Sequence, residues 1–220
     1  MATLPIFPLA TVLMPGAKLP LQIFEPRYVQ LLQDLLGGQD ERPPVFGVVA
    51  IREGFEVGDD AVRALHPIGC GALLTQAAAL EGERFFIVSE GTDRFHLDGV
   101  DATAGTPYAT ARVTWLTEAD GADGSRLEAL ATALRTELAA FATALGKEPE
   151  PAELPTDPRM LAYAVPDVVS LDVADRQRLL ECTDTASRLR LGLQLVRREN
   201  EFAATLGAVA PPALPPFGLN

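Results

Sequence analysis

The chain has 220 residues, of which 48% are hydrophobic and 22% are charged, so it can bury a sizeable core and is not disordered. Its 18 Lys and Arg against 30 Asp and Glu give a net charge of -12, which argues against nucleic acid as a partner because phosphates would be repelled. Two cysteines, Cys70 and Cys182, are too few for disulfides to stabilise a chain of this size. Such a low cysteine content is typical of proteins in a reducing cytoplasm. No signal peptide and no apolar run of membrane-spanning length is visible, so we expect a cytoplasmic protein without membrane contact.

Short apolar runs separated by Gly and Pro indicate a β-rich domain over residues 1–118. Residues 45–51 are continuously apolar, which predicts a buried strand, and residues 80–84 predict a hairpin turn between strands at 72–79 and 85–89. Residues 108–116 alternate between apolar and polar, which predicts a strand with one packed face. That packed face would carry Ala109, Ala111, Val113 and Trp115.

Two features interrupt the β-rich pattern. Residues 26–36 predict a helix, because Pro26 suits a first helical position and Gly37-Gly38 follows the last apolar residue. Gly69-Cys70-Gly71 lacks the third glycine of a dinucleotide-binding fingerprint, and it predicts a tight bend instead.

The pattern becomes helical over residues 119–207. An apolar stripe at a spacing of 3.6 residues predicts a long helix that carries Leu127, Leu130, Leu134, Leu138, Phe141 and Leu145. A Pro- and Glu-rich linker over 147–158 follows, and further helices are predicted near 160–165, 172–181 and 184–207. The last of these is apolar on two sides, which favours burial between two layers over a face kept for a partner. Residues 208–220 form a Pro-rich tail that we expect to be extended.

Motifs for catalysis are missing from the sequence. No serine lies in a Gly-x-Ser-x-Gly elbow, and His66 and His96 are more typical of structural or surface residues than of general bases. Gly146-Lys147 is followed by Glu148, so the phosphate-binding loop of ATPases is not present. His66 and Cys70 make one pair of potential metal ligands without a second pair nearby. We therefore expect no catalytic residue, no cofactor and no metal.

Two residues stand out as candidates for contact with another molecule. Phe55 is an aromatic residue in a loop rich in carboxylates, so it either folds back onto the core or faces a ligand. Met14 precedes the Pro15-Gly16 turn, and methionine either fills gaps in cores or serves adaptable binding surfaces.

The N-terminal residues resemble the start of the N-terminal domain of Lon protease, and the similarity continues in order over about residues 3 to 205. The strings that carry it are Leu4-Pro5-Ile6-Phe7-Pro8-Leu9, Met14-Pro15-Gly16, Phe24-Glu25-Pro26-Arg27-Tyr28, Ile68-Gly69-Cys70-Gly71, Gly91-Thr92-Asp93-Arg94-Phe95 and Pro107-Tyr108. Gln22 departs from the family, which often has His there. The resemblance implies an α+β protein, with an N-terminal PUA-like β-barrel followed by a C-terminal α-helical bundle.

The resemblance also implies a function. In Lon this domain engages unfolded or damaged proteins, whereas the ATPase and peptidase modules lie downstream, so we expect a stand-alone, non-catalytic module. Its partners would be unfolded or flexible polypeptide segments and a Lon-type or other protease, and it would act as a receptor or adaptor in protein turnover. The candidate peptide-binding residues are Met14, Phe24, Tyr28 and Phe55. The motif residues expected to have structural roles are Pro15, Gly16, Glu25, Pro26, Arg27, Gly69, Gly71, Arg94 and Phe95.

Two other functions stay open at this point. A PUA-like fold can bind RNA or a small ligand, but the densest group of basic residues is expected to be a solvated helix face. That group is Arg188, Arg190, Arg197 and Arg198. A structural subunit of a larger complex would use the second apolar side of the last helix or the Pro-rich tail.

Overall fold

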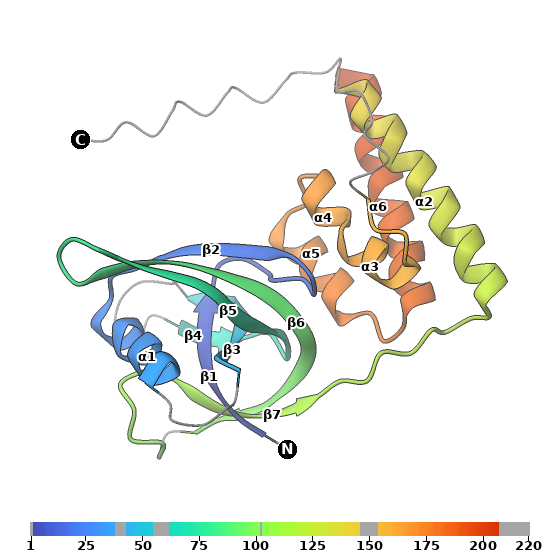
Figure 1. Cartoon of the computed structure of the whole chain (residues 1–220). Coiled ribbons are helices and arrows are strands. Elements are labelled where there is room, and N and C mark those ends of the chain that lie inside the picture. The colour runs from blue at the N-terminus through green and yellow to red at the C-terminus, as the bar shows by residue number, and fades with distance from the viewer. Residues whose placement is uncertain (1, 38–42, 55–61, 102, 146–153, 207–220) are drawn as a thin grey trace. The chain divides into compact units, whose positions relative to one another are not determined.

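A computed structural model describes residues 2–37, 43–54, 62–101, 103–145 and 154–206, and these contain seven strands and six helices (Figure 1). Two compact units make up the chain. Unit 1 comprises residues 1–119 and 171–184, and unit 2 comprises residues 120–170 and 185–220. Phe55, most of the 147–158 linker and the Pro-rich tail lie outside the described residues. The architecture is mixed α and β, with a strand-rich sheet and helices.

The strands of unit 1 pair almost entirely antiparallel, except that β1 (Ala2–Leu9) is parallel to β3 (Val45–Gly54). From β1 the pairing passes through β7 (Thr110–Trp115), β6 (Arg84–Val100) and β5 (Ile68–Leu80) to β3. Because β3 also pairs with β1, the series of pairings returns to its start. Two further strands flank this series: β2 (Lys18–Ile23) pairs with β6, and β4 (Val62–Leu65) pairs with β3.

The core of unit 1 lies on the inner side of these strands, where Ile6, Val49, Phe95 and Val113 are buried. The predicted strand at 45–51 and the predicted hairpin are confirmed as β3 and as β5 and β6, which join through the turn at Gly82. The predicted helix is confirmed as α1 (Pro26–Gly37).

The prediction for residues 108–116 holds only in part. Ala111 and Val113 are buried in β7, as expected, but Thr110 on the other face is buried too. Trp115 pairs with Phe95 and contacts its ring edge-on, with centroids 5.7 Å apart, yet it is 40% exposed. Its position at the end of β7 explains this, because the rim of the sheet has fewer neighbours to cover a large ring.

The tight bend predicted at Gly69-Cys70-Gly71 is wrong, because these residues lie inside β5. Glycine is needed there because of close packing. A Cβ on Gly69 would lie 2.6 Å from Phe95 Cζ and 2.6 Å from the Val48 carbonyl oxygen. A Cβ on Gly71 would lie 2.5 Å from Thr92 Oγ1. The two glycines therefore let the Phe95 ring and the neighbouring strand approach the β5 backbone.

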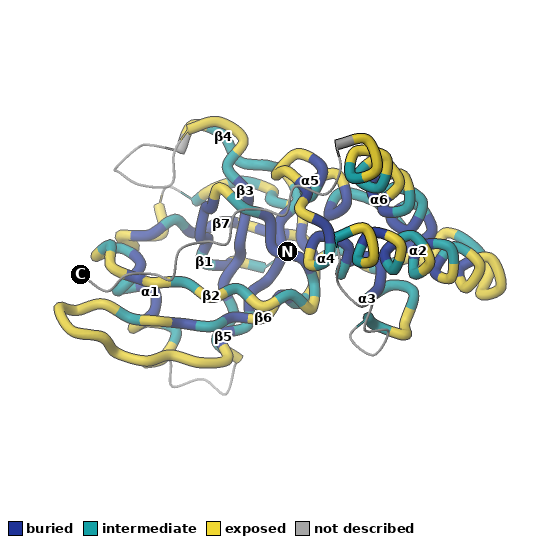
Figure 2. Tube along the Cα trace, turned by 90° about the horizontal axis from the view of Figure 1, so that it is seen from above, coloured by how far each residue is buried: buried dark blue, intermediate teal, exposed yellow. Residues whose placement is uncertain are grey.

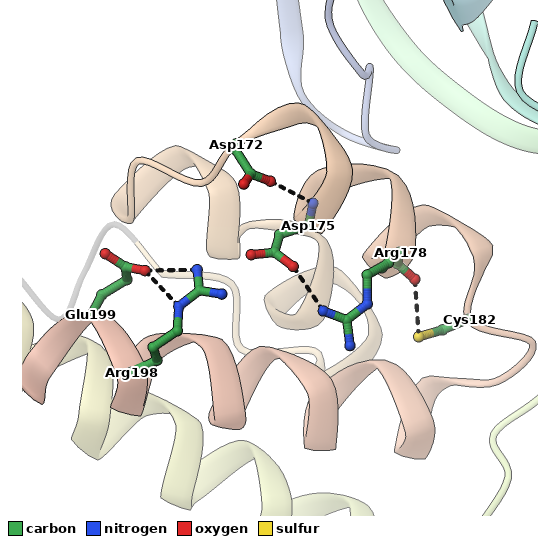
Figure 3. A network of polar contacts seen from close by, with 6 residues as sticks. All are labelled: Asp172, Asp175, Arg178, Cys182, Arg198 and Glu199. Carbon is green, nitrogen blue, oxygen red and sulfur yellow. Dashed lines mark hydrogen bonds and ion pairs between the residues drawn. The ribbon is translucent and has the colours of Figure 1, made fainter. Parts of the chain in front are cut away.

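Helix α5 (Val173–Glu181) belongs to unit 1, although the sequence pattern grouped it with the helices after residue 119. Its predicted start is confirmed: Asp172 accepts a hydrogen bond from the Asp175 backbone N–H at 2.8 Å, and Arg178 pairs with Asp175 at 2.8 Å (Figure 3). Gln177 Nε2 also donates to the Ile68 carbonyl oxygen at 3.0 Å, which joins the helix to β5.

Arg94 on β6 is buried, with 2% of its surface exposed. Its guanidinium connects the two segments of unit 1 by hydrogen bonds near their ends, at residues 118, 180 and 182. Its Nε donates to Glu118 Oε1 at 2.6 Å, and its Nη1 donates to the carbonyl oxygens of Leu180 and Cys182 at 2.6 and 2.7 Å. A buried guanidinium with these acceptors is a stable arrangement, because a charge left without them would be costly.

Unit 2 is helical. The long helix α2 (Gly124–Ala144) buries most of the predicted stripe, and it lies beside α6 (Thr185–Leu206) (Figure 1). The short helices α3 (Pro158–Tyr163) and α4 (Val165–Val168) complete the unit. Helices α4 and α6 pack closely at Gly192 of α6, where an added Cβ would lie 3.1 Å from Val165 Cγ2.

Helix α6 is only partly as predicted. Its two apolar sides do contain the buried residues Leu189 and Leu195, but Phe202 is 54% exposed. The expectation of a solvated basic face is wrong for Arg188, which is fully buried with its guanidinium 4.0 Å from the centre of the Tyr163 ring. Arg198 binds Glu199 through two hydrogen bonds of 2.9 and 2.7 Å (Figure 3).

Candidate functional site

An apolar hollow of about 120 Å³ lies in unit 1 where β1, β2 and the start of α1 meet. Its wall consists of residues from the ends of two strands, from the β2–α1 connection and from the first turn of α1. These residues are Phe7, Pro8, Leu9, Leu21, Gln22, Ile23, Phe24, Glu25 and Tyr28. Such a volume is similar to the roughly 150 Å³ of an apolar cavity that accepts benzene, so the hollow has room for about one apolar side chain.

Two stacked rings fix one side of the hollow. Phe7 and Tyr28 have ring centroids 3.8 Å apart with an angle of 11° between the planes, and Phe46 packs against Phe7 at 6.1 Å. All three side chains are buried or nearly so. The hollow is therefore formed in advance, because its wall belongs to the core.

Local sequence sets the direction in which α1 starts. The Glu25 carbonyl oxygen accepts hydrogen bonds from the backbone N–H groups of Tyr28 and Val29 at 2.9 and 3.0 Å. Arg27 Nη2 pairs with Glu25 Oε2 at 2.8 Å across Pro26. This short turn carries Phe24 at its start and leaves the Phe24 side chain 56% exposed at the edge of the hollow.

The structure brings together only part of the predicted peptide-binding set. Phe24 and Tyr28 line the hollow. Met14 is 3% exposed and does not line it; its carbonyl oxygen instead accepts a hydrogen bond from the Ala17 N–H at 3.1 Å. Phe55 lies outside the described residues.

The motif residues with expected structural roles lie in three places. Glu25, Pro26 and Arg27 form the turn beside the hollow, as described above. Pro15 and Gly16 lie in the turn before β2, where the Gly16 N–H donates to the Gly91 carbonyl oxygen at 2.8 Å. Gly69, Gly71, Arg94 and Phe95 lie on β5 and β6, away from the lining of the hollow.

Sequence reasoning missed most of the lining. The apolar pattern of these residues is the same as that of core strand residues, so the pattern alone does not separate the wall of a hollow from a core; they are Phe7, Leu9, Leu21 and Ile23. Their position at the two strand ends that precede a Pro-containing turn is the one feature that could have indicated them.

Titratable groups of the described chain offer little chemistry. Burial raises the pKa of the Cys70 thiol far above its ordinary value, which suppresses the reactive thiolate. Burial and a 2.7 Å hydrogen bond to Asp34 raise the pKa of Tyr108 to about 12. His96 pairs with Asp98 at 2.9 Å on the exposed side of β6. Among the residues that the structure describes, no three potential ligands gather as a metal site. None of the described helices combines the length and the hydropathy of a membrane span.

Comparison with known proteins shows which family the chain resembles. The family model for the ATP-dependent protease La (LON) substrate-binding domain matches residues 3–198. Lon protease of Anaeromyxobacter dehalogenans is 29% identical over 212 residues, which are 91% of this chain and 24% of that protein. Lon protease 2 of Sorangium cellulosum is 31% identical and is matched over 90% of this chain and 25% of its own length. The chain thus spans about a quarter of these curated relatives.

Two solved structures have the same fold. The N-terminal domain of the Mycobacterium avium complex Lon protease superposes with a TM-score of 0.68 at 19% identity, over 89% of this chain and 98% of that one. The Lon N-terminal domain protein from Xanthomonas campestris gives a TM-score of 0.57 at 22% identity, over 90% and 98% of the two chains.

Proposed function

Because the chain belongs to the LON substrate-binding domain family, we propose that it recognises unfolded polypeptide segments and does not alter them covalently. The observation that carries the proposal is the preformed apolar hollow with Phe24 exposed at its edge. An unfolded segment exposes apolar side chains that a folded protein hides, so a hollow with room for one such side chain distinguishes the two.

The strength of binding expected from the hollow is low. Burying one apolar side chain contributes about 1.5 to 3 kcal/mol. A dissociation constant of 1 mM already requires about 4 kcal/mol. The hollow alone therefore selects apolar side chains without holding a segment, and stable binding requires further contacts. Such weak, sequence-tolerant recognition suits a receptor for many different unfolded chains.

The net charge of -12 supports a preference among clients. Long-range repulsion disfavours acidic segments and attraction favours basic ones, and both effects weaken as salt screens them. We propose that the module acts in protein turnover as a receptor or adaptor, with a Lon-type or other protease as partner. The return of the strand pairing to β1 supports the PUA-like barrel as the scaffold.

The test is a fluorescence anisotropy titration with labelled, reduced and carboxamidomethylated ribonuclease A, a basic chain that cannot refold. We expect saturable binding that is absent with native ribonuclease A and with single-stranded RNA. The Phe24→Ala variant should bind at least fivefold more weakly. Phe202→Ala is the matched control, because Phe202 is 54% exposed against 56% for Phe24 but belongs to unit 2 and does not line the hollow.

Each other outcome has a clear meaning. Equal losses in both variants, or none in Phe24→Ala, would exclude the hollow as the recognition site. Salt-sensitive binding of the RNA would favour the RNA-binding function instead. A change in the mass of the ribonuclease chain after incubation would contradict the non-catalytic role.

A further inference from the structure

The outer half of β5 has one side without a strand beside it. On one side β5 pairs with β6 over its whole length, from Ile68 opposite His96 to Leu80 opposite Arg84. On the other side its pairing with β3 ends at Leu73, and a last hydrogen bond runs from the Leu74 N–H to the Pro44 carbonyl oxygen at 2.9 Å. Over residues 75–80 no other strand in the described ranges pairs with this second side.

This edge lacks the features that normally prevent strand addition. Proteins protect exposed edges with charged residues, proline or very short strands. Residues 75–80 read Thr-Gln-Ala-Ala-Ala-Leu, without charge or proline, and all six are exposed (Figure 2). On the other side of the same three-stranded arm, the outer strand β2 carries Lys18 and Pro20. One border of the arm is thus protected and the other is not.

An exposed apolar face accompanies the edge. Phe86 is 43% exposed and lies directly opposite Ala78 in the pairing of β5 with β6, so both side chains are on one face. Leu80, two residues after Ala78, shares this face and is 42% exposed. A strand added at the edge would place every second side chain beside this face.

We infer that the edge at residues 75–80 binds an extended polypeptide segment as an additional β-strand, and that the segment is neutral or basic. Backbone N–H and C=O groups at a sheet edge are complementary to any extended backbone, which makes such binding tolerant of sequence. Glu81 and Glu83 are exposed at the tip of the hairpin, and the chain carries a charge of -12, so a basic segment is favoured. A second copy of the chain would bring the same negative charge and is disfavoured.

This inference rests on the proposed function for its ligand, but it concerns a second place on unit 1. The hollow would select an apolar side chain, and the edge would hold the backbone. Because the two contacts involve different groups, an experiment can observe them separately.

The test is amide hydrogen exchange, followed by NMR on the whole ¹⁵N-labelled chain. The probe is reduced, carboxamidomethylated ribonuclease A, with native ribonuclease A as control. In an edge strand alternate N–H groups point outward, so these amides among residues 75–80 should exchange fast in the free protein. We expect the unfolded probe to slow their exchange at least tenfold and to leave the turn at Glu81 and Gly82 unchanged. Shifts of the Phe24 backbone amide signal report on the hollow in the same samples.

Four results would decide the inference. Phe24 shifts without protection of the edge would overturn it and leave the proposed function intact. Neither signal would overturn both. Protection that depends on protein concentration and not on the probe would show that the edge pairs with a second copy, which also overturns it. Protection of the edge that persists in saturated Phe24→Ala would support it, because the backbone contact would then be independent of the hollow.

Discussion

The ring of Phe7 on β1 stacks on the ring of Tyr28 on α1, with centroids 3.8 Å apart and 11° between the planes. This contact joins the first turn of the helix to a strand of the core. The residues that line the hollow belong to β1, β2, α1 and the turn between β2 and α1. The position of the hollow therefore depends on core packing, and its exposed residue Phe24 is the part that can change without affecting the fold.

Replacing Tyr28 should therefore affect stability as well as binding. Tyr28 is 5% exposed, and truncating a buried aromatic residue to Ala typically costs about 3 to 5 kcal/mol. We expect Tyr28→Ala to lower the urea midpoint by a corresponding amount. Phe24→Ala should stay within about 0.5 kcal/mol of the unchanged protein, because Phe24 is a surface residue. Similar losses for both variants would show that Phe24 contributes to the core.

The glycine in β5 gives a second prediction. A Cβ at Gly69 would meet the Phe95 ring and the Val48 carbonyl oxygen at 2.6 Å, and the Phe95 ring is fully buried and cannot move aside. Gly69→Ala should therefore destabilise the protein by about 1 to 3 kcal/mol, as overpacking typically does.

Gly37→Ala is the matched control, since a Cβ there would meet no atom within 4 Å. In the last turn of α1 the alanine should be neutral or stabilise by up to about 1 kcal/mol. Thermal unfolding of both variants measures this contrast, and a neutral Gly69→Ala would contradict the close packing.

Much of the fold follows from local sequence patterns. The helix after Pro26, the buried strand at β3 and the turn before Arg84 each depend on residues within a few positions, so periodicity and turn residues predict them. The prediction of a tight bend at Gly69 is wrong because glycine is needed there for contact with the ring of Phe95, 26 positions later in the chain. No local sequence pattern contains that contact. Local sequence also does not predict that α5 belongs to unit 1, because this depends on the distant hydrogen bond from Arg94 to the Leu180 carbonyl oxygen.

The candidate site was predictable only in part. Phe24 and Tyr28 carry the signature string and line the hollow, whereas Phe7 and Leu21 are ordinary strand residues in the sequence. Met14 shows the opposite problem, because an adaptable side chain suits a core gap as well as a binding surface, and here it is buried. Composition cannot separate these two uses of an apolar residue.

A pH dependence is expected from Glu137 on α2. A hydrogen bond from Arg197 lowers the pKa of this carboxyl below its ordinary value, partial burial opposes the shift, and Asn200 lowers the pKa further. A carboxyl with a lowered folded-state pKa stabilises the fold above its unfolded-state pKa, and this stabilisation is lost as the pH falls through the folded-state pKa.

Urea unfolding at several pH values tests this. At pH 7 Glu137→Gln should unfold at a lower urea concentration than the unchanged protein, and the difference should shrink progressively below about pH 4.3, where the unfolded chain binds the proton. Glu128→Gln, an exposed change on the same helix, should show no such difference. A difference in urea midpoint between the two proteins that stays constant down to pH 3 would exclude the ion pair as its cause.

The two cysteines should differ in reactivity. Neither forms a disulfide, and Cys70 is fully buried with a strongly raised pKa, whereas Cys182 is partly exposed. A thiol reagent such as dithiobis(nitrobenzoic acid) should therefore modify Cys182 in the native protein and both residues only after unfolding in guanidinium. The variant Cys182→Ser should react only after unfolding; fast reaction of that variant under native conditions would show that unit 1 opens around Cys70.

The hydrogen bonds of Arg94 have a consequence for how the polypeptide can be divided. The backbone leaves unit 1 after Ala119 and re-enters it at Leu171, and the carbonyl groups that receive the Arg94 guanidinium belong to the returning piece. A fragment ending at residue 119 would contain the seven described strands and Glu118, but Arg94 would lose both main-chain acceptors, and a hydrogen bond to a charged group contributes about 1.5 to 3 kcal/mol. A fragment defined by one continuous stretch of sequence therefore cannot contain all of unit 1 without part of unit 2, because the segments of the two units alternate along the chain.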